Sequence, residues 1–379
     1  MDTRNPRTKL IALYVVLATL ALSEEAVAVP GVKVVNCNNG KTITNALSRA
    51  QPGDTIRVKG TCHEKVTITT DRITLDGQGT ATIDGGGGQP TEFDGVVTID
   101  AVQGVTIKGF TIQHGPGEGI LGLRGAAFAV RNTTVRENGF TGVVVGQSST
   151  AELSDCSLHH NGNGMEVVTG SSAVFKGTID ITDNSVGGLD INGTSIVEVR
   201  GAHVQASRNG GFGVVAGSNS ELSFFGYATS AGSTLTVDAN VRGGIALGDS
   251  LLEVLSENTT ITVRNSPVGI IVRPGNIVSP FGSGTFVIEN SDVGLDFRLG
   301  GTAIFRGGLT VQNNGTGVRT EDGAGVLWFI SIPPNPSAIT GNGLDVDLRF
   351  GARATFDGVA VGTITCDGTA LSRGTTVCP

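Results

Sequence analysis

The sequence predicts an all-β protein built from many short strands, and three observations support this fold class. Glycine accounts for 58 of the 379 residues, and valine, isoleucine and threonine are spread evenly along the chain. Methionine occurs only twice, and apolar residues seldom recur at helical spacing. β-Branched residues and glycine in this abundance favour short strands and tight turns. A phrase made of asparagine, glycine and an apolar–polar alternation recurs along the chain, which indicates a repeat protein.

The first 28 residues have the pattern of an export signal. Arg4, Arg7 and Lys9 precede an apolar run over residues 10–22, and residues 26–28 (AVA) are the small residues that a signal peptidase accepts. We expect cleavage after Ala28, because an uncleaved anchor needs about 20 apolar residues to cross a bilayer. No later segment is apolar over such a length. The mature protein is therefore predicted to be secreted or periplasmic, with no membrane span.

The repeats can be aligned on an asparagine that precedes the glycine and the alternation. Neighbouring copies lie 23 to 31 residues apart. The aligned residues are Asn138, Asn161, Asn184, Asn209, Asn240, Asn265, Asn290, Asn314 and Asn342. A unit of this length has room for three short strands but cannot bury both of their faces alone, so we expect the units to stack as a solenoid. Each strand then pairs in parallel with its counterpart one coil away, at about 4.8 Å.

Alternation within a strand predicts which side chains form the core. In GLDIN, Leu189 and Ile191 are expected to point inward and Asp190 outward. In GLDFR, the same pattern buries Leu295 and Phe297. The asparagines are expected at a corner, where their amides can hydrogen-bond from coil to coil and left-handed backbone angles are tolerated.

The repeats and the segment before them, NCNNGKTITNALSRAQPGDTIRVKGTCHEKVTI, resemble the right-handed parallel β-helix proteins, the fold shared with pectate-lyase-like enzymes. The resemblance covers nearly all of the mature chain. It implies a single-stranded right-handed parallel β-helix of about ten or more three-strand coils, with an amphipathic helix from Thr42 or Thr44 to Ala50 capping the first coil. The implied organisation is a signal peptide at 1–28, a cap and first coil at 29–70, the β-helix at 71–360 and a disulfide-closed cap at 361–379.

The five cysteines agree with export. Cys37 and Cys62 bracket the first segment and Cys366 and Cys378 the last, so we expect a disulfide within each couple. Cys156 stands alone and is predicted to be a buried, small apolar residue. A zinc site is not indicated, because no two cysteines lie two to four residues apart.

Glu166 and Asp190 are the candidates for catalysis. With the asparagines in register, they occupy equivalent outward positions on successive coils, close enough to act as an acid and base pair or to share a cation. The alternative is two solvated carboxylates on a polar surface. The resemblance implies enzymes that cleave acidic polysaccharides with carboxylates, calcium and a basic residue, or with paired aspartates. The chain has no Asp-Asp pair and no NTD-like or RIK-like motif, so no catalytic residue is assigned by resemblance.

Asp296, Arg319 and Asp345 are candidates for binding, because the alignment places them in one outward column. Arg319 could hold the carboxylate of a charged sugar in a bidentate contact, through two parallel N–H···O hydrogen bonds. The same residues could instead form a ladder of exposed ion pairs, each worth about 0–1 kcal/mol. The sequence leaves both interpretations open.

Trp328 is the candidate for stacking against a sugar ring, since it lies beside a proline-rich insertion, although a core position fits its pattern equally well. The phenylalanines at apolar alternation positions are predicted to stack in the core; they are Phe175, Phe224, Phe297, Phe305 and Phe356.

The histidines suggest no site. His159 and His160 are sequential on a predicted strand, where side chains point to opposite faces, and His114 has no evident carboxylate partner. No metal ligand and no cofactor are therefore assigned, with calcium kept as an alternative for the segment DITDNSVGGLDING.

Charge and composition limit the function. A formal net charge of -8 argues against a nucleic-acid partner, whose phosphates require clustered lysine and arginine. The preferred hypothesis is an exported, noncatalytic β-helix that presents an elongated surface to an extracellular polysaccharide or a cell-envelope component. One alternative is a divergent polysaccharide lyase or glycoside hydrolase acting on an acidic polysaccharide. Another is a structural spacer or adhesin-like stalk.

Overall fold

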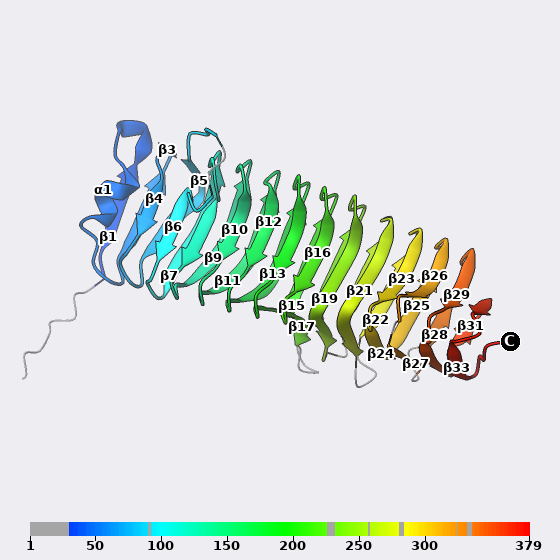
Figure 1. The fold of residues 1–379 in the computed structure, drawn as a ribbon. Coiled ribbons are helices and arrows are strands. Elements are labelled where there is room, and N and C mark those ends of the chain that lie inside the picture. The colour runs from blue at the N-terminus through cyan, green and yellow to red at the C-terminus, as the bar shows by residue number, and fades with distance from the viewer. Residues whose placement is uncertain are drawn as a thin grey trace, which may run out of the picture.

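A computed structural model describes residues 30–89, 92–225, 232–256, 258–279, 284–323, 325–331 and 336–379. Over these residues the chain is a parallel β-solenoid of about 13 turns with almost no helix. Figure 1 shows the turns standing in one row, from the N-terminal coil in blue to the C-terminal coil in red. The prediction of an all-β stack of three-strand coils is confirmed. The predicted signal peptide at 1–28 lies outside the described residues.

Three parallel sheets form the sides of the coils. Sheet 1 begins with β1 (Val32–Asn36) and β2 (Thr55–Lys59), sheet 2 with β3 (Thr61–His63), and sheet 3 with β4 (Val66–Ile68). Longer strands bend around a corner and serve two sheets. Those that join sheet 1 to sheet 2 are β5 (Thr74–Asp84), β7 (Val105–Gln113), β9 (Ala127–Arg136), β11 (Thr150–His159), β13 (Ser172–Thr182) and β15 (Ile196–Ser207). Those that join sheet 3 to sheet 1 are β19 (Gly243–Val254) and β21 (Val268–Ser279).

The remaining strands belong to one sheet each and pair in parallel with the coils on either side. Sheet 1 continues with β17 (Glu221–Phe225), β24 (Thr302–Arg306), β27 (Val326–Ile330), β30 (Arg353–Asp357) and β33 (Leu371–Gly374). Sheet 2 continues with β18 (Thr234–Asp238), β20 (Thr260–Arg264), β22 (Thr285–Glu289), β25 (Gly308–Gln312), β28 (Ser337–Ile339) and β31 (Ala360–Val361). Sheet 3 continues with β6 (Val97–Asp100), β8 (Ile120–Leu123), β10 (Thr141–Val145), β12 (Asn163–Val167), β14 (Gly187–Ile191), β16 (Phe212–Gly217), β23 (Val293–Arg298), β26 (Thr316–Glu321), β29 (Leu344–Leu348) and β32 (Ile364–Cys366).

Two short helical segments lie at the N-terminal end, η1 (Cys37–Asn39) and α1 (Ile43–Leu47). Thr42 caps α1, because its side chain accepts a hydrogen bond from the Asn45 backbone N–H. Ile43 is fully buried in the core. The helix is thus shorter than the predicted segment ending at Ala50, and its role as a cap stays a prediction. Within the described ranges, no helix has the length and apolar character that a membrane crossing requires.

Strand alternation identified the core correctly. Leu189, Ile191, Leu295 and Phe297 are all buried, as predicted. The predicted core phenylalanines are buried too, namely Phe175, Phe224, Phe305 and Phe356. Since every second side chain of a strand is committed to the core, a functional site must be built from the outward residues and the corners.

A ladder of stacked asparagines forms the corner between sheets 2 and 3. The backbone N and the Nδ2 of Asn184 donate to Asn209 Oδ1 at 3.1 and 3.0 Å, and Asn184 Oδ1 accepts the same two bonds from Asn161. Asn184 Nδ2 also donates to the Leu158 carbonyl. These bonds satisfy a buried amide that would otherwise cost about 1–3 kcal/mol. A side chain on Gly188 would meet the Asn209 amide at 2.9 Å, which explains why glycine accompanies the asparagine.

Two asparagines of the aligned set are one residue away from this ladder. Ser266 and Ser291 hold the ladder position, whereas Asn265 and Asn290 precede them with a φ of 55°. The left-handed angles thus belong to the residue before the ladder and not to the ladder itself. Sequence alignment could not separate the two positions, because asparagine suits both.

A second ladder, which the sequence analysis missed, runs along the corner between sheets 3 and 1. The backbone N–H groups of Ser149, Ser171 and Ser195 each donate to the serine hydroxyl of the next coil at 3.1–3.2 Å, and this series ends at Ser220.

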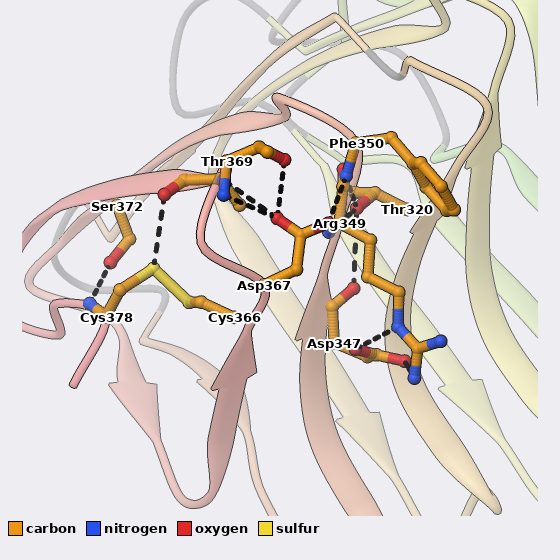
Figure 2. The surroundings of a disulfide bond; sticks show 10 residues. Thr320, Asp347, Arg349, Phe350, Cys366, Asp367, Thr369, Ser372 and Cys378 are labelled. Carbon is orange, nitrogen blue, oxygen red and sulfur yellow. Dashed lines mark hydrogen bonds and ion pairs between the residues drawn. A yellow bond between two sulfur atoms is a disulfide. The ribbon is translucent and has the colours of Figure 1, made fainter.

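Both predicted disulfides are present, Cys37–Cys62 and Cys366–Cys378. Cys156 is a free, buried thiol, as expected, and burial raises its pKa to about 11. Figure 2 shows the C-terminal disulfide beside a turn in which the Asp367 carboxylate accepts hydrogen bonds from the Thr369 hydroxyl and the Phe350 N–H. These bonds lower the pKa of Asp367 to about 2. The predicted terminal segments 29–70 and 361–379 both contribute strands to the sheets.

Candidate functional site

One column of outward side chains on sheet 3 contains both predicted catalytic residues and two of the four predicted binding residues, Asp296 and Arg319. Strand register gives the column as Thr98, Leu121, Val144, Glu166, Asp190, Val215, Ala246, Ile271, Asp296, Arg319 and Asp347. Charged residues occupy it at two places, the Glu166–Asp190 pair and the run from Asp296 to Asp347.

Glu166 and Asp190 face each other across adjacent strands, as the alignment predicted. Their pairing in the β12–β14 ladder places both side chains on one face, with their backbones about 4.8 Å apart. Thr141 Oγ1 and Asn163 Nδ2 donate to Glu166 Oε1 at 2.8 and 2.7 Å, which fixes the orientation of that carboxylate. Asn192 Nδ2 donates to Asp190. Both carboxylates are half-buried.

The surroundings of Asp190 raise the pKa of its carboxyl to about 6. Burial is the main cause, because it disfavours the charged form, and repulsion from the Glu166 carboxylate adds to it. The hydrogen bond from Asn192 acts in the opposite direction without cancelling them. A carboxyl that holds its proton in mildly acidic solution can serve as a general acid.

Residues 92–94, a turn segment before β6, cover the start of the column and form a groove beside Glu166. The buried Glu118 carboxylate accepts hydrogen bonds from the backbone N–H groups of Phe93 and Asp94 at 3.1 and 2.9 Å, which holds this segment against β8. Leu121 and Val144 point outward, yet they form a small buried cluster of their own. The Phe93 side chain remains 68% exposed.

The groove has a volume of about 350 Å³ and is lined by aromatic, aliphatic, carboxylate and small polar side chains. Phe93 comes from the covering segment, Phe140 directly precedes β10, Thr141 begins β10, and Glu166 lies on β12. We call it the Phe93–Phe140 groove. Aromatic faces beside hydrogen-bond acceptors suit a ligand with apolar ring faces and hydroxyl groups. Neither phenylalanine nor Glu118 could be recognised from the sequence, because only the fold brings residues 92–94 over sheet 3.

The second charged part of the column is a network of ion pairs. Asp296 is fully buried, and its Oδ2 accepts from the guanidinium groups of Arg298 and Arg319 at 2.7 and 2.8 Å. Glu321 lies 3.1 Å from Arg298 and 3.3 Å from Arg319. Both arginines are thus engaged with two carboxylates each. These contacts support the ion-pair interpretation of Asp296 and Arg319 over the gripping of a sugar carboxylate.

Asp345 does not belong to this column, and its predicted register is wrong. Arg319 pairs with Asp347 in the β26–β29 ladder. Asp345 instead ends the asparagine ladder, since its Oδ1 accepts from the backbone N and Nδ2 of Asn342 at 3.0 and 2.9 Å. Arg319 and Asp347 each follow their ladder asparagine, Asn314 or Asn342, by five residues, whereas Asp345 follows Asn342 by only three.

Trp328 lies on a different face from the other predicted binding residues. It points outward from β27 in sheet 1 and is 40% exposed. Of the two positions that its pattern allowed, the structure has the exposed one. The four predicted binding residues therefore do not form a single site.

His114 has two carboxylate partners that the sequence analysis missed. Its Nδ1 lies 2.9 Å from Asp84 Oδ2, and its Nε2 lies 2.9 Å from Glu137 Oε2. Both contacts raise the pKa of His114, that with Asp84 the more. With both ring nitrogens occupied, the histidine ties three successive coils together. The spacing of 23 residues between His114 and Glu137, one repeat, was the signal that could have revealed the contact.

His159 and His160 lie side by side, so the prediction that they point to opposite faces is wrong. The reason is that β11 ends at His159 and that His160 has a φ of 56°. Their Nδ1 atoms lie 2.7 Å apart. In the described part of the chain, one group of three metal-ligand side chains has its ligand atoms within 4.8 Å of one another, namely Cys37, Cys62 and Glu64. Its two sulfurs are joined in a disulfide.

Comparison with known proteins matches this architecture. Residues 94–261 match the family model described as right handed beta helix region. No curated protein sequence matches the chain. Among solved structures, the pectate lyase Pel9A aligns with a TM-score of 0.49 and 15% identity, over 76% of this chain and 79% of its own.

Two further solved structures align over more of the chain. The periplasmic alginate epimerase AlgG has a TM-score of 0.46 and 14% identity, over 90% of this chain and 82% of its own. The alginate lyase from Paenibacillus sp. str. FPU-7 has a TM-score of 0.42 and 13% identity, over 90% and 99%. All three TM-scores are below 0.5 and all three identities are 15% or less, so no residue role is transferred from these structures.

Proposed function

The chain is a right-handed parallel β-helix repeat protein, and we propose that it binds a carbohydrate chain in the Phe93–Phe140 groove on sheet 3. The observation that supports this most is the composition of the groove, in which two aromatic rings lie beside the Glu166 carboxylate. The C–H faces of a sugar ring pack on aromatic rings, and its hydroxyl groups donate to carboxylates. This is the noncatalytic, binding role that the sequence favoured.

We place this binding outside the cytoplasm, in a secreted or periplasmic protein. Two disulfides close the two ends of the solenoid, and structural disulfides persist in oxidising compartments. The partner is then an extracellular polysaccharide or a glycan of the cell envelope.

Affinity measurements with purified protein test the binding role. The panel comprises polygalacturonate, alginate, xylan and cello-oligosaccharides, and binding is measured by calorimetry. We expect at least one polysaccharide to bind, and Phe93→Ala and Phe140→Ala each to weaken it about tenfold, as losing about 1–2 kcal/mol of aromatic contact would. Phe350→Ala is the matched control, because Phe350 is exposed (55%) near the C-terminus. Binding that all three variants retain equally would refute the groove as the site.

A second candidate function is cleavage of the bound polysaccharide by Glu166 and Asp190. The observation that favours it is the raised pKa of Asp190, about 6. On paired neighbouring strands about 4.8 Å apart, a protonated Asp190 can give its proton to the leaving glycosidic oxygen while the Glu166 carboxylate attacks the anomeric carbon. The bond between the anomeric carbon and the leaving oxygen breaks as the bond to Glu166 forms, and a water deprotonated by Asp190 then hydrolyses the bond to Glu166.

Product analysis separates cleavage from binding. The same panel is incubated with the protein, and reducing ends and unsaturated products are followed. A hydrolase would release reducing ends, and Asp190→Asn would lower the rate by about 100-fold or more. Asp180→Asn, on the neighbouring sheet 2, would leave the rate unchanged. A panel polysaccharide that binds tightly but yields no product supports the noncatalytic role.

A further inference from the structure

Sheet 1 ends in an outward patch of apolar and cationic side chains near the C-terminus. We call it the C-terminal patch and define it as Val326, Trp328, Ile330, Arg353, Leu371 and Arg373. These residues lie on β27, β30 and β33, which Figure 1 shows in the orange and red coils. The exposed fractions of Val326, Trp328 and Leu371 are 43%, 40% and 55%. Apolar side chains exposed together in this way mark a binding surface.

Strand register arranges the patch in two parallel columns. One column contains Trp328, Thr355 and Arg373, and the other contains Val326, Arg353 and Leu371. Because neighbouring strands are about 4.8 Å apart, each guanidinium lies within one or two strand spacings of the indole or of the apolar side chains. The groove between these side chains has a volume of about 540 Å³.

Nine of the 17 arginines in the described part of the chain form ion pairs, and the two arginines of the patch are not among them. Arg208, Arg264, Arg298 and Arg319, for example, each form ion pairs with neighbouring carboxylates. Among the described residues, no carboxylate or other acceptor contacts the guanidinium group of Arg353 or of Arg373.

The groove is therefore locally cationic. Asp357 also lines it, so two cations face one carboxylate. In a chain with a formal net charge of -8, this local positive excess is complementary to an anion.

We propose that the C-terminal patch binds an anionic sugar, with the ring stacked on Trp328 and its anionic group held by Arg353 and Arg373. A planar guanidinium grips a carboxylate or sulfate through two parallel N–H donors. The exposed indole provides the flat apolar face that a sugar ring covers. Carboxylated and sulfated sugars share this chemistry. The site is separate from the Phe93–Phe140 groove and does not depend on it, since the two lie on different sheets.

Matched polymers with one sugar backbone test this proposal. Binding of the full-length mature protein to dextran, carboxymethyl dextran and dextran sulfate is measured by calorimetry at constant ionic strength. We expect one or both anionic polymers to bind and uncharged dextran to bind at least tenfold more weakly. Which anionic polymer binds more tightly identifies the preferred group. Equal affinity for the uncharged and the anionic dextrans would overturn the proposal.

Variants locate the site and separate recognition of a sugar from simple charge attraction. Arg353→Ala with Arg373→Ala should weaken binding by about 100-fold or more, since it removes both of the charge-assisted hydrogen-bond donors that hold the anionic group. The control removes two other exposed arginines, Arg57→Ala with Arg242→Ala, and should change the affinity less than about threefold. Equal losses in the two double variants would show nonspecific attraction and refute the site.

The tryptophan decides the class of ligand. Trp328→Ala should weaken binding of the anionic dextran about tenfold, with most of the affinity restored in Trp328→Phe. Polyglutamate of the same charge should bind more weakly than the anionic dextran and be insensitive to Trp328→Ala. Polyglutamate binding that equals that of the sugar polymer and depends on Trp328 would identify an acidic peptide as the ligand and refute the proposal. Phe140→Ala should retain dextran binding, so this test and that of the Phe93–Phe140 groove can fail separately.

Discussion

A carboxylate on the outer face of a solenoid is ordinarily hydrated and ionised, and Asp190 differs because its neighbours shield it from water. The pKa of about 6 follows from burial first and from the adjacent Glu166 carboxylate second. A pKa raised by folding stabilises the protein fully at pH values below the unfolded pKa, near 4, and this stabilisation is lost as the pH rises through about 6.

This linkage predicts the effect of neutralising either carboxylate. Asp190→Asn should raise the free energy of unfolding at pH 7 by about 1–2 kcal/mol, because it removes a charge that the fold disfavours. Glu166→Gln should lower the pKa of Asp190 below the value of about 6 that it has beside Glu166, measured by carbon NMR of the carboxyl groups. Asp180→Asn is the control for stability. Titration of Asp190 near pH 4 in the unmodified protein would contradict this account.

His114 predicts a pH dependence of the same sign as Asp190, at higher pH. Its pKa is raised by Asp84 first and then by Glu137, and Glu137 also lies 3.3 Å from Arg136. The protonated ring stabilises the fold fully below the unfolded pKa of about 6.5, and this stabilisation is lost as the pH rises through the higher folded value. The melting temperature should therefore fall as the pH rises above about 6.5, and it should fall less in His114→Gln. Parallel profiles for the two proteins would show that His114 carries no such linkage.

The contrast between Asp190 and His114 shows what the sequence can predict at the scale of residues. Glu166 and Asp190 share the same place in successive repeats, so counting alone paired them. His114 lies before the first aligned asparagine, so the alignment did not include it. Its partner Asp84 ends β5 and lies 30 residues before it, more than the 23 residues that separate His114 from Glu137. Burial, which sets the pKa of Asp190, depends on distant segments and is not visible in a repeat pattern.

At the scale of elements, the ladders determine how one coil joins the next. Asn184, for example, exchanges hydrogen bonds with both neighbouring coils. The buried asparagines of the ladder are Asn138, Asn161, Asn184, Asn209, Asn240 and Asn314. The period-two alternation of apolar residues predicted the strands. The regular spacing of the repeats predicted that each strand pairs in parallel with its counterpart in the next coil. The exact ladder residue was not predictable where asparagine also occupies the position before it, as at Asn265 and Asn290.

Replacing a ladder asparagine should cost more stability than replacing an asparagine that precedes the ladder position. Asn184→Ala should lower the free energy of unfolding by about 3 kcal/mol, because it removes bonds to Asn161, Asn209 and the Leu158 carbonyl and leaves buried groups unsatisfied. Asn265→Gly should change it by less than about 1 kcal/mol, since glycine also adopts the left-handed angle. Chemical denaturation measures both. Equal losses would contradict the assignment of ladder positions.

At the scale of the whole molecule, a solenoid is held together by contacts between neighbouring coils, so its ends are the first parts able to open. The Cys37–Cys62 disulfide closes a loop with a sequence separation of 25 at the N-terminal end. The C-terminal end has a disulfide of its own, with a separation of 12. Composition and cysteine positions predicted this arrangement, whereas the surfaces that the long stack presents could be located only from the folded chain.

Removing the N-terminal disulfide should loosen that end selectively. With Cys37→Ala and Cys62→Ala, we expect about 3 kcal/mol less protection against hydrogen exchange for amides of β1 and β2, as loop-closure entropy implies. Amides of β12 and β14, near the middle, should keep their protection. Cys156→Ala, which removes a thiol outside any disulfide, is the control. A uniform loss along the chain would show that the solenoid unfolds as one cooperative unit.

The claim that the Phe93–Phe140 groove is the carbohydrate site is tested most directly by hydrogen exchange of the protein saturated with whichever panel polysaccharide binds. The account predicts slower exchange for amides of residues 92–94 and 140–145, with sheet 2 unaffected. Slowing confined to other faces of the solenoid, with none at these two segments, would contradict it.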